Sequence, residues 1–123
     1  MNKNFVGVGL EDPRSVVEDF KDRVISLFGN QIQSMILFGS VARKEYSSDS
    51  DIDVLVIVRD STDKLRREIT GIGFEELLSH GWYVSAKVIG KGEFDYISGL
   101  KIPLIKDISK DGVVIYGKDI RKS

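Results

Sequence analysis

The sequence contains no cysteine, one histidine and two prolines among its 123 residues. The absence of cysteine excludes disulfides, thiolate zinc sites and cysteine nucleophiles, and it fits a reducing compartment. No apolar stretch approaches the roughly 20 residues of a membrane-spanning helix, and the amino terminus lacks the basic and apolar segments of a signal peptide. We therefore expect a cytoplasmic protein with no membrane partner.

The sequence also has no excess of charge of either sign. Its 18 basic and 19 acidic residues give a net charge of −1. Sequence-independent binding to nucleic acid depends on many contacts between phosphates and Lys or Arg, so we do not expect nucleic acid as a partner. A chain of this length fits one domain, residues 1–123, which can bury a core without crosslinks.

Apolar residues recur in a pattern that predicts strands alternating with helices. Residues 13–28 should form the first helix, capped by Asp12 and ended by a left-handed Gly29. Gly71 and Gly73 weaken a later helix and could break it. The other expected helices span 40–45, 61–79, 93–100 and 103–110, and the expected strands span 34–38, 51–58, 82–89 and 112–116. This order predicts an α/β fold in a single domain, with a small mixed sheet flanked by helices.

One short segment carries most of the functional information. A turn, Gly39-Ser40, follows one apolar run, and Asp51 and Asp53 open the next. Side chains alternate along a strand, so the two carboxylates should point the same way. Two like charges held side by side repel each other, and one tends to keep its proton unless a cation lies between them. The pair therefore predicts a site for a cation that prefers oxygen ligands, such as Mg²⁺.

Six residues of this segment occur in an order that resembles the signature of the polymerase-beta-type nucleotidyltransferase superfamily: Gly39, Ser40, Arg43, Ser50, Asp51 and Asp53. The segment is most similar to the short prokaryotic branch called minimal nucleotidyltransferases, which are often paired with HEPN-domain proteins. Residues 112–117 also resemble the usual ending of that family. The resemblance implies the nucleotidyltransferase fold.

The same resemblance implies a metal-dependent reaction. A nucleoside monophosphate, AMP from ATP in the leading interpretation, would move to a hydroxyl of a protein or small molecule. Asp51 and Asp53 would be catalytic residues and ligands of Mg²⁺ or Mn²⁺. The N–H groups at the start of the short helix after the turn can hold phosphates. The residues expected to bind the nucleoside triphosphate, ATP or another NTP, are Gly39, Ser40, Arg43 and Ser50.

The sequence departs from the family pattern at one position. In the family a third carboxylate on a neighbouring strand usually helps to bind metal and activates the acceptor hydroxyl. The expected strand 82–89 carries no acid on its polar face, where Ser85 is the first candidate for that position. Lys87 on the same face could instead neutralise phosphate charge. The base could come from Glu93, from Asp95 or from a partner chain.

The absence of the third acid supports a second interpretation. The chain could be a catalytically weak or inactive nucleotide-binding module that acts as the antitoxin-like partner of a HEPN-type protein. The sequence leaves the acceptor, the nucleotide and the oligomeric state open. The only histidine, His80, ends an expected helix beside Gly81, where a cation suits the helix dipole. We therefore expect a structural or exposed role for His80 and no metal site.

Overall fold

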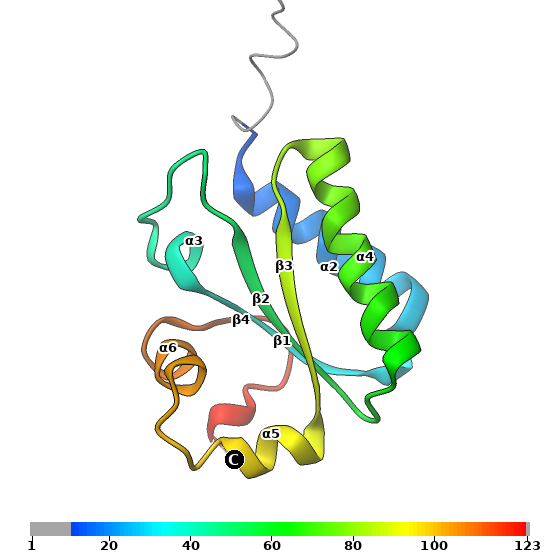
Figure 1. Cartoon of the computed structure of the whole chain (residues 1–123), viewed down its shortest axis with the longest axis vertical. Coiled ribbons are helices and arrows are strands. Elements are labelled where there is room, and N and C mark those ends of the chain that lie inside the picture. The colour runs from blue at the N-terminus through cyan, green and yellow to red at the C-terminus, as the bar shows by residue number, and fades with distance from the viewer. Residues whose placement is uncertain (1–10, 123) are drawn as a thin grey trace, which may run out of the picture.

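The computed structural model describes residues 11–122. These residues fold around a mixed sheet of four strands (Figure 1). The strand order is β3-β2-β1-β4, so β1 (Ile32–Phe38) and β2 (Ile52–Val58) are the central strands. β1 runs antiparallel to β2 and to β4 (Val113–Gly117). β2 runs parallel to β3 (Val84–Gly90), and this direction decides which side chains lie beside one another at the site.

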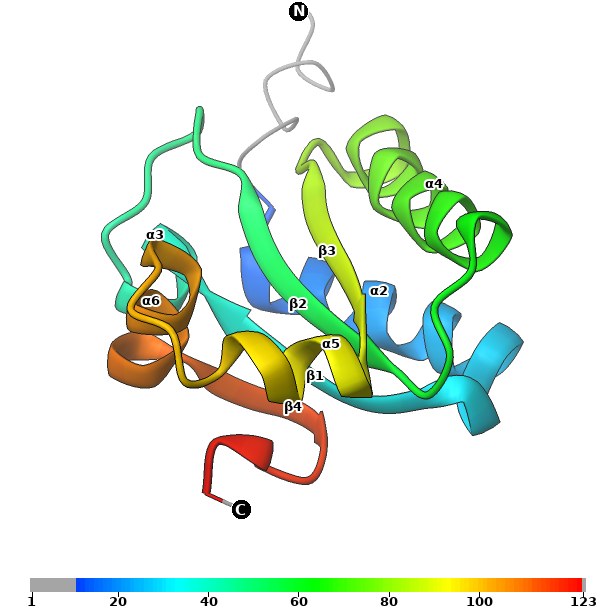
Figure 2. The same cartoon turned by 60° about the horizontal axis from the view of Figure 1, so that its bottom comes forward.

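Helices cover both faces of the sheet (Figures 1 and 2). On one face α2 (Pro13–Phe28) and α4 (Asp63–His80) pack on the larger apolar cluster. The opposite face carries a second cluster under α5 (Lys91–Ile97), α6 (Pro103–Asp111) and the short helix η2 (Ile120–Lys122). None of the described helices is long and apolar enough to cross a membrane. Because both faces are covered, the central strands are apolar at nearly every residue.

The described residues confirm the expected α/β class with a small mixed sheet. α2 begins and ends at the expected residues, and Asp12 caps it by accepting a hydrogen bond of 2.9 Å from the Arg14 N–H. The prediction for Gly29 is wrong. This residue has a right-handed φ of −45° and begins the short helix η1 (Gly29–Gln31). A tighter turn of this kind can pair the last helical carbonyls without a left-handed residue.

The long helix α4 continues through both of its glycines, so the expectation that they could break it is wrong. Gly73 is buried against β3, and a Cβ at this position would collide with the carbonyl oxygen of Val84. A Cβ at Gly71 would meet no atom within 4 Å. Gly73 therefore allows α4 to lie close to the start of β3, which is the part of that strand beside the candidate site.

Gly73→Ala should lower the free energy of unfolding by roughly 1–3 kcal/mol, because the added methyl group overpacks the contact between α4 and β3. Gly71→Ala is the matched control, since it adds the same atoms to the same helix in open space. It should raise the free energy of unfolding by roughly 0.5–1 kcal/mol, because alanine loses less backbone entropy than glycine. Urea unfolding of both variants measures the difference. Equal effects would contradict the close approach at Gly73.

Candidate active site

The Asp pair lies at the start of β2. The strand begins at Ile52, one residue later than expected, so Asp51 precedes it and is exposed. Ile52 and Val54 point into the core beneath α2 and α4. Asp53 lies between them in the strand and therefore points to the opposite face, where it is half-buried. The site is thus on the face of the sheet that α5 and α6 partly cover.

The Gly39 turn lies directly against Asp53. Phe38, the last residue of β1, pairs with Asp53 across the antiparallel strands, and α3 (Gly39–Arg43) begins at the next residue. Gly39 has a φ of +81°, and a Cβ there would collide with the Asp53 carboxylate. Glycine is required here on both grounds. The sequence analysis placed Gly39 among the residues that bind the triphosphate, which stays a prediction; the structure shows that its missing side chain makes room for Asp53.

The start of α3 offers backbone donors at the site. The residue before it, Phe38, provides no side-chain cap, so the first N–H groups of α3 have no capping acceptor from that residue. Ser40 is half-buried in this first turn. The helix ends at Arg43, and the next residue, Lys44, has a left-handed φ of 62° that turns the chain toward the loop leading to β2. These features agree with a phosphate-binding turn, and that role stays a prediction.

Arg43 at the end of α3 and Ser50 in the loop before β2 are both held by contacts with neighbouring residues. The Arg43 guanidinium lies 3.1 Å from Glu45 Oε1 and 3.8 Å from Asp111 Oδ2, and its charge acts to lower the pKa of Asp53. The Ser50 hydroxyl accepts a hydrogen bond of 3.0 Å from the Ser47 N–H. Ser50 therefore stabilises the loop that positions Asp51. Its contact with a nucleotide stays a prediction.

Two residues of β3, Ser85 and Lys87, are the candidates for the position where the family resemblance implies a third carboxylate. Ser85 is the direct neighbour of Asp53 in the parallel ladder, so their side chains share a face. Lys87, two residues further along the same face, is exposed and acts to lower the pKa of Asp53. The structure thus places Ser85 beside the Asp pair, as the alternation in the sequence predicted, with a hydroxyl where a carboxylate was expected.

The structure does not bring Glu93 and Asp95 to the site. Gly90, which precedes α5, pairs with Val58 at the far end of β2, five residues beyond Asp53. At about 3.3 Å per residue, that is roughly 16 Å away. Glu93 accepts a hydrogen bond of 3.3 Å from the Gly90 N–H, and Asp95 is paired with Lys91 at 2.8 Å. Both carboxylates serve local contacts of α5, and neither is placed to act as the base.

An acid that the sequence analysis missed lies on α6. The charge of Asp107 contributes to raising the pKa of Asp53, which places it within electrostatic reach of the pair. α6 packs beside α3, with Ile105 and Ile108 buried and Asp107 exposed. One weak signal was present in the sequence, since Asp107 and Asp111 are four residues apart and share the polar side of an amphipathic helix. That signal does not tell which element the helix faces.

The electrostatics of Asp53 indicate a cation site. Burial raises the pKa of Asp53, the neighbouring Asp51 raises it further, and Lys87 and Arg43 oppose the shift. Two carboxylates at a strand end are hard oxygen donors, which is the ligand type that Mg²⁺ prefers. A divalent cation would remove the repulsion that raises this pKa. The residues present therefore fit the metal that the resemblance implies.

A pocket of about 420 Å³ opens beside Asp51. It lies between the loop before β2 and the end of α4, and it combines polar side chains with exposed apolar ones. Its volume falls in the usual range for small-ligand sites. A larger pocket, of about 740 Å³, lies by α2, α3 and β4 and includes neither residue of the Asp pair. The residues that line the smaller pocket are Ser48, Asp49, Ser50, Asp51, Phe74, Leu77, Gly81 and Tyr83.

Comparison with known sequences agrees with this geometry. The sequence pattern of the nucleotidyltransferase domain matches residues 17–116, a range that includes the Gly39 turn, the Asp pair and β3. MJ0141 of Methanocaldococcus jannaschii, a candidate protein adenylyltransferase, is 27% identical over 101 residues. That match covers 81% of this chain and 95% of the archaeal protein.

Solved structures share the fold. A chain in a toxin–antitoxin complex with AMP-PNP superposes with a TM-score of 0.59 at 17% identity, over 84% of this chain and 75% of that one. A chain in the complex of tri-AMPylated Shewanella oneidensis HEPN toxin with MNT antitoxin gives a TM-score of 0.50 at 16% identity, over 85% and 76%. At these identities the structures show the fold alone. Because the family match spans most of the sequence, the chain belongs to the nucleotidyltransferase domain family, as its motif predicted, and it is a nucleotidyltransferase.

Proposed function

We propose that this nucleotidyltransferase transfers AMP from ATP to a hydroxyl group of a partner protein. The observation that carries the proposal is the half-buried Asp53 carboxylate, which lies between Asp51 and the Gly39 turn with its pKa raised. Such a pair next to backbone donors suits a triphosphate with its cation. The similarity to a candidate protein adenylyltransferase favours AMP as the group and a protein as the acceptor.

Asp51 and Asp53 would hold Mg²⁺ or Mn²⁺, which when bound neutralises triphosphate charge. The first N–H groups of α3 would bind phosphate oxygens, and Arg43 would add positive charge beside them. In the reaction the acceptor oxygen forms a bond to the α-phosphorus of ATP, and the bond from that phosphorus to the β-phosphate breaks. Pyrophosphate leaves, and the hydroxyl proton passes to a base. The chain's contribution is to hold these groups in line.

The acceptor in this proposal is a HEPN-type partner protein. Chains of the same fold occur in a toxin–antitoxin complex with AMP-PNP and beside a tri-AMPylated HEPN toxin. In this chain the end of α4 exposes a group of apolar side chains, with Phe74 50% and Leu78 71% exposed. Phe74 also lines the pocket beside Asp51. Exposed apolar patches of this kind often mark protein-binding surfaces, so the partner would dock next to the site.

A second candidate function is a nucleotide-binding antitoxin-like partner with little or no catalysis. The observation that favours it is Ser85, which stands beside Asp53 where the family usually has a carboxylate. A serine hydroxyl is a poor base at neutral pH. The two functions share the Asp pair and the docking surface, and they differ in whether a covalent product forms.

We expect this protein, with Mg²⁺ and ATP labelled in the α-phosphate, to transfer label to a HEPN-type protein encoded beside it. ATP labelled in the γ-phosphate should give no labelled product, because the transferred group is AMP. Mass spectrometry of the partner should show one or more adenylyl groups on hydroxyl side chains. A partner that binds tightly and stays unmodified would support the antitoxin-like function instead.

A further inference from the structure

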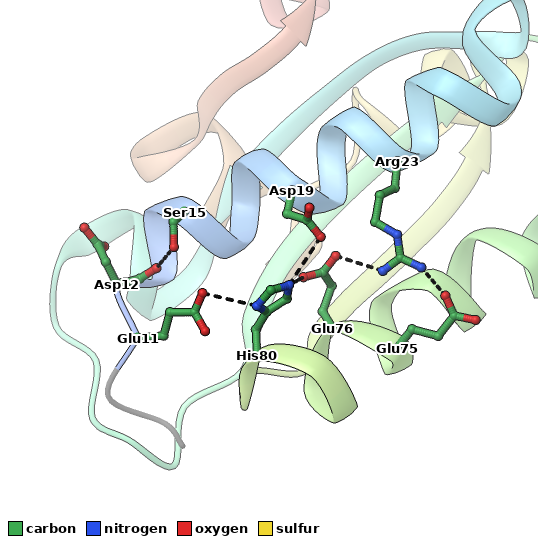
Figure 3. Close-up of polar contacts among 8 residues, drawn as sticks. All are labelled: Glu11, Asp12, Ser15, Asp19, Arg23, Glu75, Glu76 and His80. Atoms are coloured by element: carbon green, nitrogen blue, oxygen red, sulfur yellow. Dashed lines mark hydrogen bonds and ion pairs between the residues drawn. The ribbon is translucent and has the colours of Figure 1, made fainter. Parts of the chain in front are cut away.

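A second polar cluster lies between α2 and α4, on the other face of the sheet from Asp53 (Figure 3). His80, the last residue of α4, faces three carboxylates. Its Nδ1 lies 3.2 Å from Glu11 Oε1. Its Nε2 lies 3.6 Å from Asp19 Oδ2 and 3.8 Å from Glu76 Oε1. The sequence analysis gave His80 no partner, because two of these acids lie far from it in the chain.

Glu76 is the most unusual member of this cluster. Its side chain is fully buried, at 0% exposure. One oxygen, Oε2, accepts a hydrogen bond of 3.1 Å from Arg23 Nη1, and Arg23 also pairs with Glu75. The other oxygen, Oε1, accepts no hydrogen bond from any described residue and points toward His80 and Asp19. A buried carboxylate oxygen that accepts no hydrogen bond raises the free energy of the folded state, so a positive group placed beside it would stabilise the protein.

The distances within the cluster suit an ion better than direct hydrogen bonds. The two contacts of His80 Nε2 are longer than a hydrogen bond allows. The ligand atoms of Asp19, Glu76 and His80 all lie within 4.8 Å of one another. Ligands about 2.1 Å from one tetrahedral ion are about 3.4 Å apart, so modest side-chain movements would bring these atoms onto a single ion. Glu76 and His80 are one helical turn apart on α4, and Asp19 faces them from α2.

The rival occupant is a proton. Burial, and after it the facing Asp19, raises the pKa of Glu76 to about 7, whereas Arg23 opposes the shift. Two carboxylates that face one another need a shared proton or a cation between them. The arrangement around His80 favours the cation, because Glu11 on Nδ1 leaves Nε2 directed at the two other carboxylates. A carboxylate that orients a histidine in this way is typical of protein metal sites.

We propose that Asp19, Glu76 and His80 bind one Zn²⁺ ion, which ties α2 to α4, and that Glu11 orients His80. One imidazole nitrogen with two carboxylate oxygens is a ligand set that Zn²⁺ accepts, with a fourth position open to water. The site differs in chemistry from the Asp51 pair, which offers only oxygen ligands and suits Mg²⁺. It lies at the end of α4 that leads into β3, and the ion would fix this helix end.

The test uses the full chain with Asp51→Asn and Asp53→Asn, so that the first site does not bind metal. Zn²⁺ is titrated against a chromophoric chelator after removal of metal. We expect one Zn²⁺ per chain, an affinity lowered at least 10-fold by Asp19→Asn or His80→Gln, and a loss of ~10–100-fold for Glu11→Gln. Asp22→Asn, an exposed acid on the same helix, is the matched control and should leave the affinity unchanged. Excess Mg²⁺ should not displace Zn²⁺.

Thermal unfolding gives a second readout that does not depend on the chelator. Zn²⁺ at 100 times its dissociation constant should raise the unfolding midpoint by roughly 10 °C in the protein with His80 and Asp19 intact. The shift should fall to about half or less in Asp19→Asn and persist unchanged in Asp22→Asn. If Zn²⁺ binds the parent and Asp19→Asn with equal affinity, or leaves the midpoint of the parent unchanged, the proposal is wrong and the cluster holds a shared proton.

Discussion

Replacing both Asp51 and Asp53 by Asn is expected to lower the rate of AMP transfer by at least ~10³-fold. The two carboxylates are the proposed ligands of the cation that balances triphosphate charge, and a bound metal contributes several kcal/mol to such a reaction. Each 1.36 kcal/mol corresponds to about tenfold in rate. Calorimetry should show that the affinity for ATP no longer depends on Mg²⁺. If the double variant transfers AMP at the rate of the unmodified protein, the assignment of Asp51 and Asp53 to the active site is wrong.

The folded state should survive this double replacement. Burial and Asp51 raise the pKa of Asp53 above its ordinary value of 3.8, so the folded chain binds a proton more tightly than the unfolded chain. Without a cation, the stability of the protein should therefore fall as the pH rises from the ordinary pKa through the raised one. Asp53→Asn removes this dependence. Unfolding midpoints measured over the acidic range, without Mg²⁺, should be flatter in the variant than in the unmodified protein.

The local parts of the fold and site could be predicted because they depend on residues close in sequence. The two-residue period of a strand places Asp53 opposite Ile52, and the structure has this arrangement. The same period places Ser85 on the face of Asp53. The place of Gly39 between a strand and a helix was enough to predict a functional turn there. The collision of an added Cβ with Asp53 could not be predicted, because it depends on the pairing of β1 with β2.

The remaining parts depend on strand direction and on packing between distant segments. Glu93 would lie near Asp53 only if β3 ran antiparallel to β2, and the structure has the two strands parallel. A signal was available, since a long helix between two strands is typical of a parallel crossover. For Asp107 the sequence offers only the weak signal of an amphipathic helix, and its charge acts on Asp53 because α6 packs beside α3. The partners of His80 likewise depend on how α2 packs against α4.

The second large effect concerns the base that accepts the proton of the acceptor hydroxyl. Two acids among the described residues contribute to raising the pKa of Asp53 through their charge: Asp51 and, to a smaller extent, Asp107. If Asp107 is the base, Asp107→Asn should lower the transfer rate by ~10²–10⁴-fold, the usual contribution of positioned general acid–base catalysis. The affinity for ATP should stay nearly the same. Asp95→Asn is the matched control, because Asp95 is an acid of α5 at the far end of the sheet.

Ser85→Asp separates this explanation from a missing base. The substitution places a carboxylate beside Asp53 on the face of the sheet that the two residues share, at the position where the family resemblance implies one. If the unmodified chain lacks a base, Ser85→Asp should raise a slow transfer rate, and Asp107→Asn should change nothing. If Asp107 already accepts the proton, Ser85→Asp should leave the rate unchanged or lower it, because a third carboxylate would repel those of Asp51 and Asp53. Single-turnover rates of the unmodified chain, Ser85→Asp and Asp107→Asn with a HEPN-type acceptor distinguish these outcomes, and no transfer from any of the three would favour the nucleotide-binding partner.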